Sequence, residues 1–186
     1  SVMNRRASLP LIAAGAEDEG IEELRRAAPD VPAAKHALGN ELYAVGKMAE
    51  ATSVLQDLIR DDPAHMDLHA TRLLLAQTLM AQGQFEESAA EFQTILDAAR
   101  STPSNSPVQD AARQGLTEIG TAQRIIAADL LSRRRVDEAV AHAREAVRLR
   151  PTDAGAFATL GSALAAQGKS DEAIVQFREA LRIDPG

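Results

Sequence analysis

The chain has 186 residues and a net charge of −7, and 45% of its residues are hydrophobic although only 3% are aromatic. The negative charge weighs against nucleic acid and anionic membranes as partners, because binding to either needs clustered positive charge. With no cysteine in the sequence, disulfides, thiolate metal sites and a cysteine nucleophile are excluded. The core must therefore be built from Ala, Leu, Ile and Val, and the abundant alanine favours helix.

The N-terminal part of the chain predicts an irregular or disordered segment over residues 1–16 and a capping helix over residues 17–31. The amphipathic stretch EDEGIEELRRAA carries the helical pattern, which ends at Pro29 and Asp30. Pro29 stands where a preceding repeat would close, so this helix is expected to be a half repeat. No signal peptide is visible, and the apolar runs are too short for a membrane span, so a cytoplasmic location is expected.

Four short stretches share one pattern, in which a tight turn separates two apolar periodic segments. Each predicts a helix end, a turn, and a new helix with acids in its first turn, where they suit the helix dipole. Glycine ends the first helix in three copies, which indicates a left-handed backbone. Arg134 replaces this glycine in the third copy, so that turn should be strained by roughly 1 kcal/mol. The stretches are AVGKMAEA (44–51), AQGQFEES (81–88), SRRRVDEA (132–139) and AQGKSDEA (166–173).

Small residues recur at two stations in every copy. Because a small side chain lets two helices approach closely, each copy predicts a helical hairpin. Replacing Gly161 or Ala173 with leucine should then cost about 1–3 kcal/mol or more. One hairpin cannot bury its apolar faces alone, so the hairpins must stack. The first stations are Leu38-Gly39, Leu75-Ala76, Ile126-Ala127 and Leu160-Gly161, and the second are Ala51, Ser88, Ala139 and Ala173.

This arrangement resembles the tetratricopeptide repeat (TPR), whose pattern is Trp-x2-Leu-Gly-x2-Tyr, then Ala-x3-Phe, then Pro. The final copy, from Phe157 to Pro185, matches nearly throughout, whereas Lys35, Arg72 and Gln123 occupy the Trp position of the others. The resemblance implies an all-α fold, a right-handed superhelix of stacked helix–turn–helix hairpins. The expected repeats cover residues 32–63, 64–100, 120–153 and 154–186, with a loop plus helix extension at 101–119.

The extra chain between the second and third copies contains STPSNSP, a breaker-rich loop. Ser106, Pro107 and Gln109 then form a helix start, with an N-cap, a first-turn proline and a capping-box partner. We expect one long helix from about Pro107 to Leu131. The first helix of the second copy is also expected to be long, starting near Ala64.

His65 and His69 are the sharpest metal candidates, because two histidines four residues apart on a helix share a face and can bind zinc. However, Met66 replaces the glutamate of the HExxH pattern, and no third ligand has convincing spacing, so two surface histidines are the favoured interpretation. No nucleophile elbow, phosphate loop or dinucleotide fingerprint occurs in the sequence. We therefore predict no enzyme activity, no catalytic residue, no metal and no cofactor.

A basic run at Arg133, Arg134 and Arg135 allows two interpretations. It could form a patch for an acidic or phosphorylated partner. Alternatively it is a solvated turn, whose neighbouring arginines have intrahelical partners such as Glu145. The acidic composition of the chain favours the second interpretation.

In the tetratricopeptide family the first helix of each hairpin lines a concave groove, so the resemblance implies a non-catalytic scaffold that binds a peptide or partner helix. Chaperone co-factors of this family grip a carboxylate with five residues, of which this chain matches only Asn40, so chaperone tails are not the predicted ligand. The residues expected to face the groove lie one turn either side of the small station. They are His36, Asn40, Tyr43, Leu73, Gln77, Met80, Arg124, Ala128, Leu131 and Ser162.

The last helix suggests an alternative function. Ile174, Phe177 and Leu181 give it an apolar outer face, whereas terminal repeats normally need a polar one. Either the protein continues beyond this helix, or this end packs against another chain. The alternative is therefore a regulatory or homo-oligomerising module of a larger protein that uses the C-terminal helix face.

Overall fold

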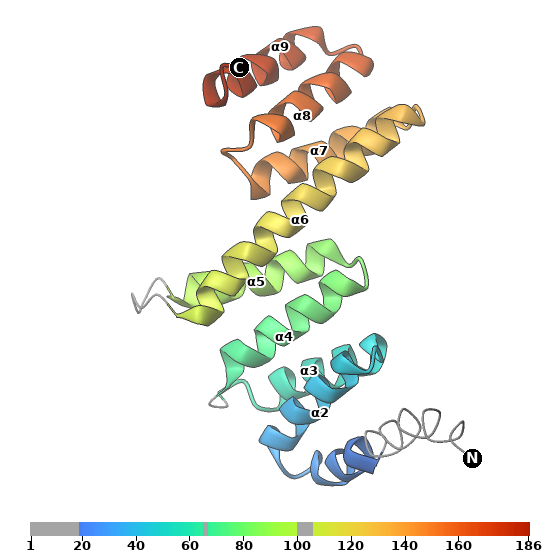
Figure 1. Ribbon diagram of the computed structural model, residues 1–186, viewed down its shortest axis with the longest axis vertical. Helices are drawn as coiled ribbons and strands as arrows, with labels where there is room; N and C mark the ends of the chain where they lie inside the picture. The colour runs from blue at the N-terminus through green and yellow to red at the C-terminus, as the bar shows by residue number, and fades with distance from the viewer. Residues whose placement is uncertain (1–18, 65–66, 100–105) are drawn as a thin grey trace, which may run out of the picture. The chain divides into compact units, whose positions relative to one another are not determined.

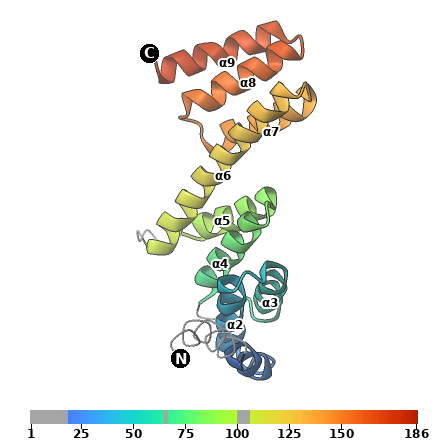
Figure 2. The same cartoon turned by 45° about the vertical axis from the view of Figure 1, so that its right-hand side comes forward.

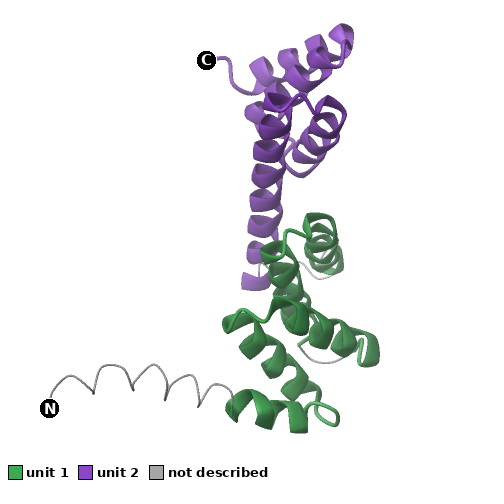
Figure 3. Ribbon diagram, turned by 90° about the vertical axis from the view of Figure 1, so that its right-hand side faces the viewer, with its two compact units in different colours: residues 1–101 green, residues 102–186 purple. Residues whose placement is uncertain are grey.

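A computed structural model describes residues 19–64, 67–99 and 106–186, which form helices joined by short turns, and no strand occurs among them (Figure 1). The all-α fold class is thereby confirmed. The chain divides into two compact units, residues 1–101 and 102–186, and each unit contains two helical hairpins (Figure 3). The predicted disordered segment at residues 1–16 lies outside the described residues.

In the first unit two hairpins stack, because α3 packs against α2 within its own hairpin and against α4 of the next (Figure 2). Each hairpin is antiparallel, and its second helix has acids in its first turn, as the sequence pattern indicated. The helices are α2 (Pro32–Ala44), α3 (Met48–Asp61), α4 (Leu68–Ala81) and α5 (Phe85–Ala99).

A helical segment at residues 19–27 precedes these hairpins and packs on the first of them. Ile21 is only 2% exposed and forms one apolar cluster with Leu38, Leu42 and Ala51. The outer side chains of the segment are polar and exposed. The segment therefore buries an apolar face against the first hairpin, and its predicted role as a cap stays a prediction.

The second unit repeats this arrangement, with α7 packed against both α6 and α8. The long helix predicted between the second and third copies is confirmed, since α6 has 26 residues and α7 has 14. Ser106 caps α6 as expected, because its hydroxyl accepts a hydrogen bond from the Gln109 backbone N–H at 3.4 Å. The helices are α6 (Pro107–Ser132), α7 (Val136–Leu149), α8 (Ala154–Ala166) and α9 (Ser170–Ile183).

The expected early start of α4 is wrong. The helix begins at Leu68 rather than near Ala64 and has 14 residues, the same length as α3. Residues 63, 64 and 67 form turns instead of a helix. Pro63 stops the preceding helix and favours a turn, and the helical pattern upstream of Leu68 is too short to overcome it.

Small residues do stand where the helices of a hairpin cross. A Cβ atom on Gly39 would lie 2.5 Å from Leu55 Cδ2, and one on Gly161 would lie 2.8 Å from Phe177 Cε1. Real Cβ atoms do not approach other carbons this closely, so neither position accepts a side chain without displacement of its neighbour. The small stations therefore set the distance between the paired helices.

The turn between paired helices has one backbone conformation in all four hairpins. Gly46, Gly83 and Gly168 have φ angles of 80°, 75° and 85°, and Arg134 occupies the same place with a φ of 59°. The Arg135 N–H donates to the Leu130 carbonyl at 2.9 Å, a bond with an equivalent in the glycine-containing turns. The expected strain at Arg134 is therefore present, because a side chain is carried in the left-handed region.

We expect Arg134→Gly to raise the free energy of unfolding by about 0.5–1 kcal/mol, since relief of the left-handed strain exceeds the entropy that glycine adds to the unfolded chain. Urea unfolding followed by circular dichroism measures the change. Arg133→Gly is the matched control, because Arg133 has a φ of −90° and gains no such relief. A loss of stability in Arg134→Gly equal to that of the control would contradict the strain.

Candidate functional site

The first helices of neighbouring hairpins lie closer together than the second helices. In the second unit the backbones of α6 and α8 lie close together, whereas those of α7 and α9 do not, and these two helices are joined through the side chains of Arg144 and Glu172 at 3.6 Å. In the first unit α2 likewise contacts α4. Each stack is therefore wedge-shaped, and its first helices form what we call the inner face of that unit. The residues predicted to face a groove lie on these first helices.

Two of the predicted residues in the first unit take part in packing. His36 Nδ1 lies 2.8 Å from Thr71 Oγ1, a hydrogen bond that joins α2 to α4. Tyr43 is half-buried and packs against two apolar clusters, one around Leu42 and one around Leu75. These two side chains therefore stabilise the hairpin stack in addition to lying on its inner face.

The other predicted residues of the first unit have no packing role comparable to that of His36 and Tyr43, and each keeps part of its surface exposed to solvent. Asn40 is exposed, and Leu73, Gln77 and Met80 are half-buried. Because an amide can both donate and accept hydrogen bonds and a thioether adapts to irregular apolar surfaces, Asn40, Gln77 and Met80 suit an adaptable binding surface.

The four residues of the second unit that were predicted to face a groove differ in character, since two are small, one is a leucine and one is an arginine. Ala128 and Ser162 are exposed, and the Ser162 hydroxyl donates to the Ala158 carbonyl of its own helix at 2.9 Å. Leu131 packs against the apolar cluster of this unit. Arg124 is half-buried between α6 and the start of α8.

The polar residues at the Trp position of the repeat are paired with the second helix of their own hairpin. Lys35 Nζ lies 2.9 Å from Asp61 Oδ2, Arg72 pairs with Glu91, and the Gln123 side chain is hydrogen-bonded to His142. Glu91 and His142 both stand three residues after the small station of the second helix. A polar contact between the two helices thus takes the place of the aromatic ring. The sequence analysis did not predict these pairs, although the spacing of Glu91 and His142 from the small station is visible in the sequence.

The Lys35 pair makes a prediction about titration. The hydrogen bond from Lys35 is the largest cause of a lowered pKa at Asp61. This pair therefore stabilises the fold at neutral pH, and its contribution is lost as the pH falls through the folded pKa. We expect Lys35→Met to raise the pKa of Asp61 toward its ordinary value in a carboxyl-detected NMR titration. Arg60→Met should raise it less, and an unchanged Asp61 pKa in Lys35→Met would contradict the pairing.

The basic run has the intrahelical partners that its solvated interpretation required. Arg133 Nε lies 3.0 Å from Asp129 Oδ2, and Arg135 donates two hydrogen bonds to Glu138. The Arg135 bonds lower the pKa of Glu138. Two of the three arginines are thus paired with an acid, whereas no acid among the described residues pairs with Arg134, which is exposed.

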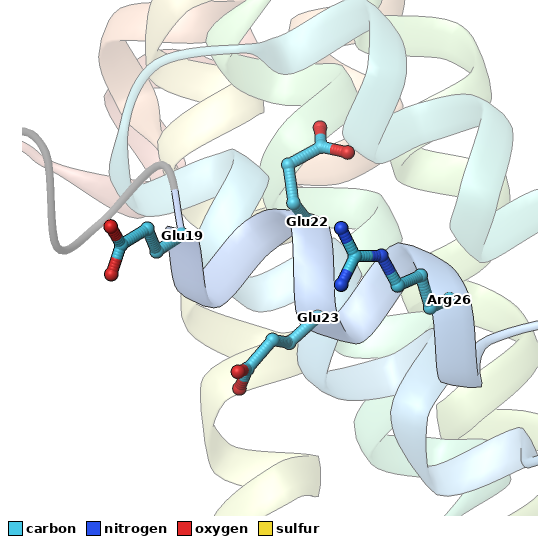
Figure 4. A pocket seen from close by; sticks show the side chains of 4 residues that line it. All are labelled: Glu19, Glu22, Glu23 and Arg26. Atoms are coloured by element: carbon cyan, nitrogen blue, oxygen red, sulfur yellow. The ribbon is translucent and has the colours of Figure 1, made fainter.

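The interpretation of His65 and His69 as surface histidines stays a prediction, because His65 lies outside the described residues. His69 is exposed, and the described residues contain no group of three His, Asp or Glu side chains that could hold a metal ion. An open hollow of about 370 Å³ occurs on the N-terminal helical segment and is lined by Glu19, Glu22, Glu23 and Arg26 (Figure 4). Its lining side chains are all exposed, so it has none of the burial that a binding pocket would need.

The fold and its inner face define a helical-repeat protein. Two family models, both described as tetratricopeptide repeat, match residues 42–114 and 126–186. The chain belongs to the tetratricopeptide repeat family. A search among curated proteins found no match.

The chain is also similar to solved structures at low sequence identity. MamA from Desulfovibrio magneticus RS-1 is 15% identical, with 97% of this chain and 93% of that chain covered and a TM-score of 0.44. The TPR2AB domain of yeast Sti1, in a complex with an HSP90 peptide, is 17% identical, with 95% and 74% covered and a TM-score of 0.48.

Among the described helices, none combines the length and the apolar character needed to cross a bilayer.

Proposed function

We propose that the chain is a non-catalytic adaptor whose inner face binds an extended peptide or a helix of a partner protein. The observation that carries this proposal is the wedge shape of each unit, in which the backbones of the first helices (α2 and α4, α6 and α8) lie closer together than those of the second helices. This shape leaves one side of the stacked hairpins lined by first helices, with Asn40, Ala128 and Ser162 exposed there. Membership of a family of protein-interaction modules supports the same conclusion. The cytoplasmic location stays a prediction.

The absence of cysteine from the sequence permits a direct test. Binders are selected from a random 15-residue peptide display library against the full chain. The affinity of the selected peptides is then measured for a chain with Asn40→Cys and Ser162→Cys, both blocked with maleimide-linked polyethylene glycol. The matched control carries the same label at Gln56→Cys and Ala141→Cys, two exposed positions on second helices. We expect at least tenfold weaker binding for the inner-face chain and little change for the control. Equal loss in both, or no binder at all, would contradict the proposal.

A second candidate function is self-association through α9. Ile174, Phe177 and Leu181 are 47%, 38% and 63% exposed, whereas the equivalent Val140 and Ala143 of α7 are 5% and 0% exposed because α8 covers them. The acids Asp171 and Glu172 lie in the first turn of α9 and Arg182 in its last. In an antiparallel pair of α9 helices from two copies, the acidic turn of one would therefore meet the basic turn of the other.

Sedimentation velocity over a range of concentrations tests this second candidate. We expect a concentration-dependent dimer that Leu181→Glu abolishes, because the charge would be buried in the pair. Val45→Glu, at an apolar residue that is 36% exposed elsewhere on the chain, should leave the dimer intact. A strict monomer at all concentrations would exclude self-association through this helix.

A further inference from the structure

Two charged side chains of α9 pair with no oppositely charged group among the described residues. Asp171 and Arg178 are both exposed, and we call them the unpaired charges of α9. Every other charged side chain of this helix has a partner. The pairs are Glu172 with Arg144, which joins α9 to α7, and Glu179 with Arg182 within α9. Asp171 and Arg178 are therefore the charges of α9 that remain for a partner molecule.

The unpaired charges lie on one line along the helix, at the border of its exposed apolar face. They are seven residues apart in the sequence, which is close to two helical turns and about 10 Å along the axis. Asp171 stands one turn before Ile174, and Arg178 stands one turn before Leu181, so each charge adjoins an exposed apolar side chain. Charges that flank an apolar seam in this way set the orientation of paired helices.

The same two positions of α7 carry the same charges, and both hold the next hairpin. Asp137 accepts a hydrogen bond from Gln167 Nε2 at 2.7 Å, and Arg144 lies 3.6 Å from Glu172. Asp137 and Arg144 stand two residues before and five residues after the small station of their helix, as the unpaired charges of α9 do. These are therefore contact positions in the repeat, and on α9 no hairpin of the described chain meets them.

A helix with one acid and one base on the same line is complementary to itself in the antiparallel orientation. When Ile174 of one copy packs on Phe177 of a second copy, a two-fold axis brings Asp171 of each copy within one turn of Arg178 of the other. The ion pair then forms twice. In a parallel pair each of these side chains would meet its own counterpart, and the like charges would repel each other.

From these observations we infer that Asp171 and Arg178 form two ion pairs between copies of the chain, which fix the antiparallel orientation of an α9 homodimer and its selectivity for a second copy. Guanidinium and carboxylate form charge-assisted hydrogen bonds that are stronger than neutral ones. A partner helix without the matching charges would leave them unpaired or repelled, which disfavours other partners. The inference rests on the proposed self-association through α9, since it names the residues that orient that pair.

Charge reversal at each position tests the inference. Asp171→Arg and Arg178→Asp each place like charges opposite one another twice, so the dissociation constant of the dimer should rise at least tenfold in sedimentation equilibrium at low salt. The chain with both changes restores both ion pairs and should regain the affinity of the unmodified chain. Arg134→Glu reverses another exposed arginine of this unit that has no acid partner, and as the control it should change the constant less than threefold.

Mixing the two single variants separates a lost ion pair from damage to the helix. Asp171→Arg has arginine at both positions and Arg178→Asp has aspartate at both, so together they should form a one-to-one dimer at least as tight as that of the unmodified chain. Chains with a misfolded α9 would not recover affinity on mixing. In about 1 M salt, where the screening length is about 3 Å, the differences among the charge variants should shrink, whereas Leu181→Glu should stay monomeric.

Other outcomes also decide the matter. Single variants that dimerise as tightly as the unmodified chain would overturn the inference and leave self-association through α9 standing. A chain with both changes that stays as weak as the single variants, or a mixture that stays monomeric, would overturn it in the same way. A strict monomer of the unmodified chain would overturn both the inference and the self-association, and would leave the adaptor function standing.

Discussion

Replacing Gly39 with leucine is expected to lower the free energy of unfolding by about 3 kcal/mol, because the crossing of α2 and α3 has no space for a side chain. The Cβ atom alone would meet Leu55 Cδ2 at 2.5 Å and Cγ at 2.8 Å. Leu55 is 0% exposed, so it cannot turn outward to make room. Urea unfolding followed by circular dichroism measures the loss.

Two variants show whether the loss comes from overpacking. Gly39→Leu combined with Leu55→Ala should recover part of the stability, since the second change removes the group that collides. Gly20→Ala is the control for adding a side chain to a helix, because no described residue lies within 4 Å of its Cβ position, and it should be neutral or stabilising by about 0.5–1 kcal/mol. A tolerated Gly39→Leu, or no recovery in the double variant, would contradict the close crossing.

Truncation of Leu164 should cost about 2–5 kcal/mol, because it leaves a cavity in the core of the second unit. Leu164 is 1% exposed and belongs to a cluster with Leu130, Ala139 and Leu160. The neighbouring alanines are too short to reach into the cavity, and the close packing of the surrounding helices prevents them from moving inward to fill it. The change in the urea midpoint of Leu164→Ala measures the cost.

Leu181 offers a matched comparison, since it is also a helical leucine of the second unit but is 63% exposed. Leu181→Ala should change the stability of the monomer by no more than about 0.5 kcal/mol. Equal losses for the two substitutions would mean that the apolar cluster around Leu164 does not form the core.

The spacing of small residues was sufficient to predict the helical hairpins. Gly39 and Gly161 stand where the paired helices cross too closely for a side chain, and a small residue at this position is visible in the sequence. The start of α4 was harder to predict from the sequence. The apolar residues upstream of Leu68 do not show whether a turn after Pro63 delays the start of the helix. Helix boundaries depend on local backbone competition of this kind.

The candidate site was predictable as a face but not in its details. Periodicity and the family resemblance placed His36 and Tyr43 on the first helices, but neither shows that His36 is hydrogen-bonded to Thr71 or that Tyr43 packs against two clusters. These contacts join residues far apart in the sequence. The unpaired charges of α9 are likewise visible only when the partners of its other charged residues are known.

The proposed adaptor function depends on peptide binding to the first helices of the two units. Backbone amide NMR of the full chain, titrated with a peptide from the display selection, tests it most directly. We expect the largest chemical shift changes on first helices, at residues such as Asn40, Gln77, Ala128 and Ser162. Largest changes on second helices, at residues such as Gln56 and Ala141, would contradict it.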